Sequence, residues 1–390
     1  MMRDRKRKIP SVCKGSIHQV SDVIFDKMRG MGLLLFLMLS SPLQSQDVTK
    51  VATTIGTFLK LDVGARAASV GGAFVALAND ATTMAWNPAG MASVGRNSLA
   101  VSHSRLYADI SHFYIGYVQP LNGSNYVGIS LIYLNSGEME VTTVEFDEGL
   151  GEYFIVSDLV LGISYARNMT DFLSLGVTIK YIREQIYREV AQTFAFDIGS
   201  YFITGVAATI LGMSITNFGG EMKLDGPDLE IPLENTTTGL EIEGGSRYST
   251  EKWPLPLTFR MGIRTDLLGG INETRISRDH RLSFLANASD PLDHTMRLSV
   301  GMEYEWRKIL SVRMGKKYNG WRRYTFAEYQ DDDQQNAYVE YPVYNENGKL
   351  SLEGLAFGAG IHYGFLQFDY ALVNFGLLDF VHQLSLQIQF

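Results

Sequence analysis

The stretch that decides the fold is VHQLSLQIQF, residues 381–390. Its apolar residues fall at every second position, and polar residues fill the positions between them. The apolar set is Leu384, Leu386, Ile388 and Phe390, and the polar set is Ser385, Gln387 and Gln389. Successive side chains of a β-strand point to opposite faces, so a period of two predicts a strand with one apolar and one polar face.

The same period recurs in other segments, of which 173–181, 255–264 and 296–306 are clear examples, with glycine and charged residues on the second face. Alternation alone also fits a soluble β-sandwich. The segments are about 9–12 residues long, which suits a tilted strand that crosses a bilayer. Aromatic residues near the strand ends are typical of interfacial girdles, namely Tyr181, Tyr201, Tyr304, Trp306 and Tyr363.

Fourteen strands can be placed from this pattern. They span 97–104, 111–119, 125–135, 158–168, 171–183, 190–203, 208–216, 255–265, 280–288, 294–306, 309–317, 353–363, 366–375 and 381–390. Most connections alternate between short turns and long loops, the exception being a longer turn at 266–279. Because lipid offers backbone groups no hydrogen-bond partner, such a sheet must close on itself. We therefore predict an all-β fold, a 14-stranded antiparallel transmembrane β-barrel whose ends are periplasmic. The terminal Phe390 resembles the signal read by the outer-membrane insertion machinery.

The N-terminal region follows other rules. Residues 28–46 combine a basic start, a short apolar core and a polar end, which predicts a signal peptide, and we interpret residues 1–27 as an upstream start. Without residues 1–46 the chain keeps 26 Lys and Arg against 39 Asp and Glu, and loses its single cysteine, Cys13. This composition excludes disulfides and thiolate chemistry from the exported part and disfavours a nucleic-acid partner.

Residues 47–96 separate this leader from the barrel at 97–390. Small residues dominate positions 61–80, so the backbone can pack closely, and we expect a plug inside the lumen. We assign its motif to Gly71, Gly72, Asn87, Pro88 and Gly90, in which Asn87-Pro88 marks a turn. The glycine pair is not a phosphate loop, because no G-x-G-x-x-G or Walker pattern surrounds it.

The stretch GARAASVGGAFVALANDATTMAWNPAGMA, residues 64–92, resembles the N-terminal signature of the PorV/PorQ family, which belongs to the wider group of FadL-like outer-membrane barrels. The similarity continues through YADISHFYIGYVQPL, residues 107–121. The resemblance implies a 14-stranded barrel with its N-terminal segment folded into the lumen. PorV-like members receive or shuttle cargo in type IX secretion, whereas FadL-like members take up hydrophobic molecules.

No catalytic constellation is recognisable. The histidines form no H-E-x-x-H, no G-x-S-x-G elbow occurs, and we expect no metal and no cofactor. Glu303 and Glu305 share a strand face with Arg297 and Arg307, which predicts a ladder of opposite charges in the lumen. The long loop 318–352 gathers aromatic and basic residues, which favour protein interfaces. Its candidate partner-binding residues are Trp321, Arg322, Arg323, Tyr324 and Tyr329; alternatively, the loop folds back and caps the pore.

Two functions follow. The first is a non-enzymatic outer-membrane barrel, surrounded by lipid, that serves as a docking or shuttle component of type IX protein secretion. Its partners would be the secretion translocon, the C-terminal domain of the cargo, or attachment-complex proteins. The alternative is a FadL-like transporter of long-chain fatty acids or other hydrophobic small molecules.

Overall fold

A computed structural model describes residues 53–390 except 144–145, 147–148, 150, 207, 235–240, 270–278 and 320–351. The predicted leader and the candidate loop residues Trp321, Arg322, Arg323, Tyr324 and Tyr329 lie outside these described residues. Residues 50–390 form one compact unit.

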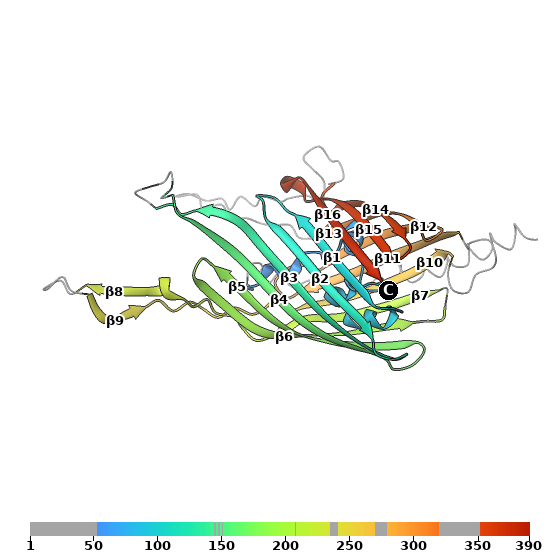
Figure 1. Ribbon diagram of the computed structural model, residues 1–390, viewed down its shortest axis with the longest axis horizontal. Coiled ribbons are helices and arrows are strands. Elements are labelled where there is room, and N and C mark those ends of the chain that lie inside the picture. The colour runs from blue at the N-terminus through green and yellow to red at the C-terminus, as the bar shows by residue number, and fades with distance from the viewer. Residues whose placement is uncertain are drawn as a thin grey trace, which may run out of the picture. The chain divides into compact units, whose positions relative to one another are not determined.

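Within the described part of the chain, fourteen strands close into one antiparallel barrel (Figure 1). They are β1 (Ser98–Arg105), β2 (Ser111–Pro120), β3 (Asn125–Glu140), β4 (Tyr153–Asn168), β5 (Leu173–Ile186), β6 (Glu189–Ile203), β7 (Thr209–Gly219), β10 (Thr258–Leu268), β11 (His280–Pro291), β12 (Arg297–Trp306), β13 (Leu310–Asn319), β14 (Leu355–Tyr363), β15 (Leu366–Asn374) and β16 (Phe380–Gln389). Each strand pairs with its neighbours in sequence, except that β7 pairs with β10 and β1 with β16. The predicted fold class is confirmed.

The barrel closes through the stretch that first indicated it. Ser98 of β1 pairs with Gln389 of β16, and the backbone N–H of Phe390 donates to the carbonyl of Asn97 at 3.0 Å. The ring of Phe390 is 63% exposed. Its role as an insertion signal stays a prediction.

Strand edges depart most from the prediction where the sheet extends beyond the apolar belt. β3 runs on to Glu140 and β4 starts at Tyr153, because the ends of the two strands continue to pair with each other beyond the predicted limits. Sequence analysis also missed a hairpin in the acidic loop between β7 and β10, formed by β8 (Glu230–Glu234) and β9 (Glu241–Arg247). A short 3₁₀ turn, η3 (Pro227–Leu229), precedes this hairpin, and another, η5 (Gly376–Leu378), connects β15 to β16.

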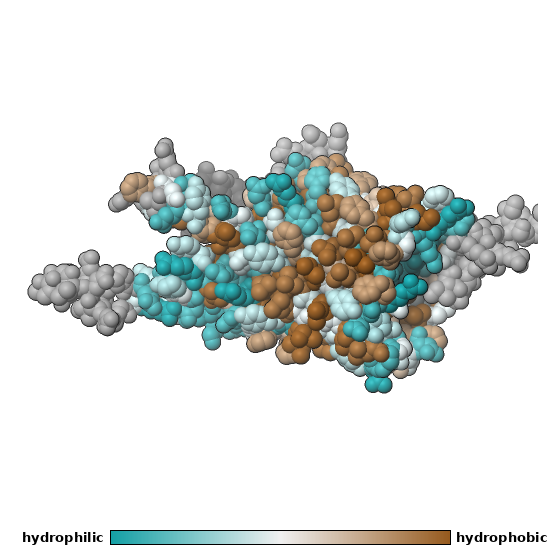
Figure 2. All heavy atoms as spheres, viewed as in Figure 1, coloured by the Kyte–Doolittle hydropathy of each residue, from teal (hydrophilic) through white to brown (hydrophobic). Residues whose placement is uncertain are grey.

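The polarity of the wall is inverted relative to a water-soluble protein. On β16, Leu384 and Leu386 are 42% and 40% exposed, whereas the intervening Ser385 is 2% exposed. Figure 2 shows hydrophobic surface gathered over the middle of the strands. Exposed leucines outside and buried polar side chains inside are the pattern of a barrel surrounded by lipid. Among the described residues, no helix is long and apolar enough to span a membrane.

The assignment of Tyr201 to the aromatic girdle was wrong. Tyr304, Trp306 and Tyr363 are exposed, as interfacial aromatics should be, but Tyr201 is only 5% exposed. It faces inward and packs in an apolar cluster with Ala76 and other residues of the N-terminal segment. Side chains an even number of residues apart on a strand point to the same face, so Tyr201 points inward with Asp197.

Residues 53–97, which we call the luminal segment, run through the interior of the barrel. Four short helical turns punctuate it: η1 (Thr57–Lys60), α2 (Ala65–Ser69), α3 (Thr83–Trp86) and η2 (Pro88–Ser93). We call the end of the barrel with the connection from β7 to β10 the outer end, and the opposite end the inner end. The segment begins near the outer end, where Ile55 N–H donates to Pro254 O at 3.1 Å, and it leads into β1 at the inner end.

Candidate functional site

The wall receives the luminal segment on pairs of inward-facing glycines. Gly301 and Gly315 are cross-strand partners on β12 and β13, and both lie directly under the backbone of Val70. A methyl group at Gly301 would lie 2.6 Å from the Val70 carbonyl oxygen, and one at Gly315 would collide with the same peptide unit. Backbone can therefore rest against backbone only because these positions lack a side chain.

A second glycine pair supports the segment further along. Gly176 of β5 pairs with Gly199 of β6, beneath Asn87 and Pro88. Any added Cβ would overlap these two residues. Glycines on the wall strands are thus positions where the backbone of the segment can approach the wall closely.

Asn87 joins the luminal segment to the wall. Its Nδ2 donates to Val75 O at 3.1 Å and to Ser200 O of β6 at 2.9 Å, and its Oδ1 accepts from Ala89 N–H at 3.2 Å. The side chain is fully buried, and each of these bonds uses a group that an apolar residue lacks. Pro88 follows as the first residue of η2, the position where its missing N–H costs no helical bond.

Each of the other predicted motif residues is a glycine that its own local geometry requires. Gly71 and Gly72 adopt φ of 68° and 78°, which side-chain-bearing residues rarely adopt. Gly71 also approaches Lys316, whose backbone nitrogen would lie 2.8 Å from an added Cβ. Gly90 packs against Thr83 and has no room for a side chain. The structure thus places Gly71 and Gly72 by β13, and Asn87 and Pro88 by β5 and β6.

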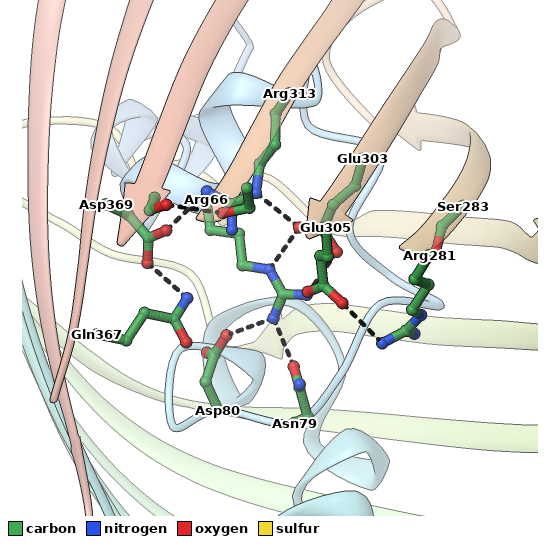
Figure 3. A network of polar contacts seen from close by, with 12 residues as sticks. Arg66, Asn79, Asp80, Arg281, Ser283, Glu303, Glu305, Arg313, Gln367 and Asp369 are labelled. Carbon is green, nitrogen blue, oxygen red and sulfur yellow. Dashed lines mark hydrogen bonds and ion pairs between the residues drawn. The ribbon is translucent and has the colours of Figure 1, made fainter. Parts of the chain in front are cut away.

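A buried network of charges clamps the segment to the wall (Figure 3). Arg66 of α2 binds Glu303 of β12 with two bonds, Nε to Oε2 at 2.8 Å and Nη2 to Oε1 at 2.7 Å. Arg313 of β13 donates to the same carboxylate at 2.6 Å and to Asp369 of β15, also at 2.6 Å. Arg66 is 3% exposed and Glu303 fully buried, so water does not replace these contacts. Bidentate charged pairs of this kind are the strong ones.

The periphery of the network involves less buried groups. Arg66 Nη1 also donates to Asn79 Oδ1 at 2.5 Å, and Gln367 donates to Asp369 at 2.8 Å. Arg281 of β11 binds Glu305 at 3.2 Å.

The sequence predicted the wrong partners for these acids. It named Arg297 and Arg307, but Arg297 forms no ion pair with them, and Arg307 lies in a turn where it pairs with Asp279. The true partner from the segment, Arg66, lies 237 residues before Glu303. A lone arginine within a run of small residues was the available signal.

The outer part of the luminal segment rests on an apolar surface instead. Phe58, 5% exposed, packs with inward side chains of the wall and of the loop that precedes β10. The buried cluster around it is Val160, Ile182, Ala191, Ala195, Met222 and Leu255. We call this cluster the outer chamber. Phe58 fills space in the outer chamber that an apolar ligand or peptide could otherwise use.

Polar contacts also hold this outer part, and Asp293 makes two of them. Asp293, in the loop between β11 and β12, accepts from Thr54 Oγ1 and from Lys60 Nζ, both at 2.6 Å. Burial on its own would raise the pKa of Asp293, but the hydrogen bonds from Lys60 and Thr54 outweigh it, so its pKa is lowered below the ordinary 3.8. The carboxylate is therefore ionised at neutral pH.

Two small cavities remain between the segment and the wall. One, about 590 Å³ of atom-free space including some open to solvent, lies between Phe58, Trp86, His112 and the wall around Lys180. The other, about 410 Å³, lies beside Lys60 and Arg260. No group of three metal-ligating side chains occurs in the described ranges.

Residues 44–230 match the family model described as type IX secretion system protein PorV, and the match contains the signature at 64–92. Over these residues, nearly half of its length, the chain is similar to the PorV family. PorV proteins are outer-membrane barrels, in agreement with the inverted polarity of this wall. A search of curated proteins finds no similar sequence.

Solved structures agree with the fold. The CymD monoaromatic hydrocarbon channel is 11% identical, with a TM-score of 0.52, over 84% of this chain and 97% of that one. The toluene transporter TodX of Pseudomonas putida has 12% identity and a TM-score of 0.49, over 82% and 95% of the two chains. A FadL homologue of Pseudomonas aeruginosa has 12% identity and a TM-score of 0.48, over 84% and 98%. At such identity the likeness to CymD is one of fold.

Proposed function

We propose that this protein is a non-enzymatic docking or shuttle component of type IX protein secretion. The observation that carries the proposal is the clamped luminal segment. Its Arg66 is bound by Glu303 in the buried network, and its backbone rests on the glycine pairs. A barrel filled in this way can act by binding at its surfaces without passing a solute through its centre.

The surface that we assign to partners is the long outer loop between β13 and β14. Its candidate residues are Trp321, Arg322, Arg323, Tyr324 and Tyr329. Aromatic and arginine side chains are enriched at the energetic centres of interfaces. The partners we expect are the secretion translocon, the C-terminal domain of the cargo, or attachment-complex proteins. The plug role of Gly71, Gly72, Asn87, Pro88 and Gly90 belongs to the same proposal.

Gene deletion tests the secretion role. Without this protein, type IX cargo should accumulate inside the cell, and re-expression of the natural chain should restore its export. A chain with Trp321, Tyr324 and Tyr329 replaced by Ser should fail to restore export. The matched control is Tyr248→Ser, an exposed aromatic of another outer loop. Normal export in the deletion strain would contradict the proposal.

A second candidate is transport of a hydrophobic molecule, favoured by the outer chamber. An apolar, inward-facing surface at the outer end of the lumen could receive a long-chain fatty acid once Phe58 withdraws. Deletion would then reduce fatty-acid uptake and leave cargo export intact. This outcome is the opposite of the one expected for docking.

A further inference from the structure

A row of cationic side chains crosses three neighbouring strands on the inner face of the barrel. Arg260 of β10 pairs in register with Ser289 of β11, and Ser289 pairs with Arg297 of β12. Adjacent strands lie about 4.8 Å apart, so the two arginine backbones are about 10 Å apart with a hydroxyl between them. Two long side chains can converge on one small group across that distance.

These residues line the smaller of the two cavities described above. Its cationic lining consists of Lys60, Arg260, Arg297 and Lys317, and hydroxyls of Ser289 and Ser299 add further donors. Arg260 is 9% exposed. The cavity encloses about 410 Å³ of atom-free space, part of it open to solvent.

Two of the four cations have carboxylate partners and two do not. Lys60 pairs with Asp293, and Lys317 pairs with Asp62. Arg260 donates to the Thr216 hydroxyl at 2.7 Å and lies over the ring of Trp86, but forms no ion pair with a described residue.

Arg297 is the less satisfied of the two arginines. Its side chain has no hydrogen bond or ion pair to any residue of the described ranges, and its buried Nε lacks a partner. Arg297 is partly buried, and leaving its buried Nε without a counter-charge is costly, since the desolvation is not repaid. The cavity therefore carries a surplus of two positive charges inside a strongly acidic chain.

We propose that this cavity binds a doubly charged oxyanion group, namely a phosphate. Two guanidinium groups neutralise its two charges, and their planar N–H forks match its oxygens. The hydroxyls of Ser289 and Ser299 supply donors for the remaining oxygens. A single carboxylate would leave one positive charge unmatched. The site does not depend on the docking role, because its two arginines without ion pairs, Arg260 and Arg297, are wall residues inside the lumen.

The test titrates the purified full-length protein in detergent with inorganic phosphate at low ionic strength, by isothermal calorimetry. Saturable binding at one site per chain is expected, and Arg297→Gln should weaken it about tenfold or more, since a charged hydrogen bond is lost. Arg297→Lys, which keeps the charge, should weaken it less. The matched control is Arg105→Gln, a 71%-exposed rim arginine, which should bind as the natural protein does.

Heat-dependent migration on a denaturing gel verifies that each variant barrel is folded. A second titration uses short-chain phosphatidic acid in the same detergent, competed by inorganic phosphate. Competition would show that the lipid phosphate and inorganic phosphate bind the same site. A failure to compete would show that the site binds free phosphate and not the lipid. Absence of saturable phosphate binding, or equal affinity in folded Arg297→Gln, would overturn the proposal.

Discussion

The two parts of the luminal segment are held in different ways. Residues 65–91 are fixed in the middle of the barrel by a buried bidentate ion pair and by backbone resting on glycine. Residues 53–62 contact the outer chamber through Phe58 and are anchored by Asp293, by a bond from Gly56 N–H to Glu184 and by the pair of Asp62 with Lys317. The first set is buried and specific in geometry, whereas the second combines an apolar contact of Phe58 with less buried polar anchors.

This difference assigns two roles: the middle part keeps the barrel closed, and the outer part can respond to a partner. Removing one member of a buried charge network leaves other charges unpaired, so the middle part should not move independently. An apolar contact, in contrast, is non-directional, and another apolar group can replace it. We therefore expect the outer part to release while the middle part stays in place.

The largest effect should come from Glu303→Gln. The substitution leaves the buried guanidinium groups of Arg66 and Arg313 without their shared counter-charge, at a cost of about 3–5 kcal/mol in the free energy of unfolding. Urea unfolding in detergent, followed by gel migration, measures it. Glu305→Gln on the same strand face is the control and should cost much less, because Glu305 is partly exposed. Equal costs would show that the network is not the clamp.

A smaller loss is expected from Gly315→Ala. The new methyl group would collide with the peptide unit of Val70 and force the segment off the wall, and overpacking of this kind costs about 1–3 kcal/mol. The same unfolding assay reports it. Gly123→Ala, in an inner turn with open space around it, should leave stability unchanged. A neutral Gly315→Ala would argue against close contact between segment and wall.

Phe58→Ala should change barrel stability by less than about 1 kcal/mol, although full burial of a Phe side chain is worth about 1.5–3 kcal/mol locally. The effect should instead appear in accessibility. Because the only cysteine, Cys13, lies in the predicted leader, Thr57→Cys provides a single labelling site in the barrel and luminal segment. A membrane-impermeant maleimide added to whole cells should label Thr57→Cys faster when Phe58→Ala is present. An unchanged labelling rate would mean that Phe58 does not hold the outer part.

The smallest change should come from Asp293→Asn. It weakens the anchor to Thr54 and Lys60 by about 1 kcal/mol, so labelling of Thr57→Cys at pH 7 should rise several-fold. The lowered pKa of Asp293 also fixes the sign of the pH effect. Its contribution is complete above pH 3.8 and is lost only as the pH falls through the lower folded value. Slower labelling in the variant would contradict this anchor.

Much of the fold could be predicted because alternation directly reports which face of a strand meets lipid. All fourteen strands were placed, and their errors lie at ends such as that of β3, where the chain leaves the apolar belt. Tyr201 was assigned to the girdle because it lies near a strand end, although its position in the alternation places its side chain on the inner face.

The interior was harder to predict. The Asn87-Pro88 turn and the glycines could be recognised locally, since their backbone requirements are local. The partners of Glu303 could not, because they depend on the register of β12 with β13 and on the path of Arg66 through the lumen. Pairs separated by more than 200 residues leave no mark on either local sequence.

Hydrogen exchange of the purified protein in detergent, read by mass spectrometry, tests the division of the luminal segment most directly. Residues 65–91 should exchange as slowly as the barrel strands, and residues 53–62 should exchange much earlier. Exchange of residues 65–91 together with, or before, residues 53–62 would contradict the account.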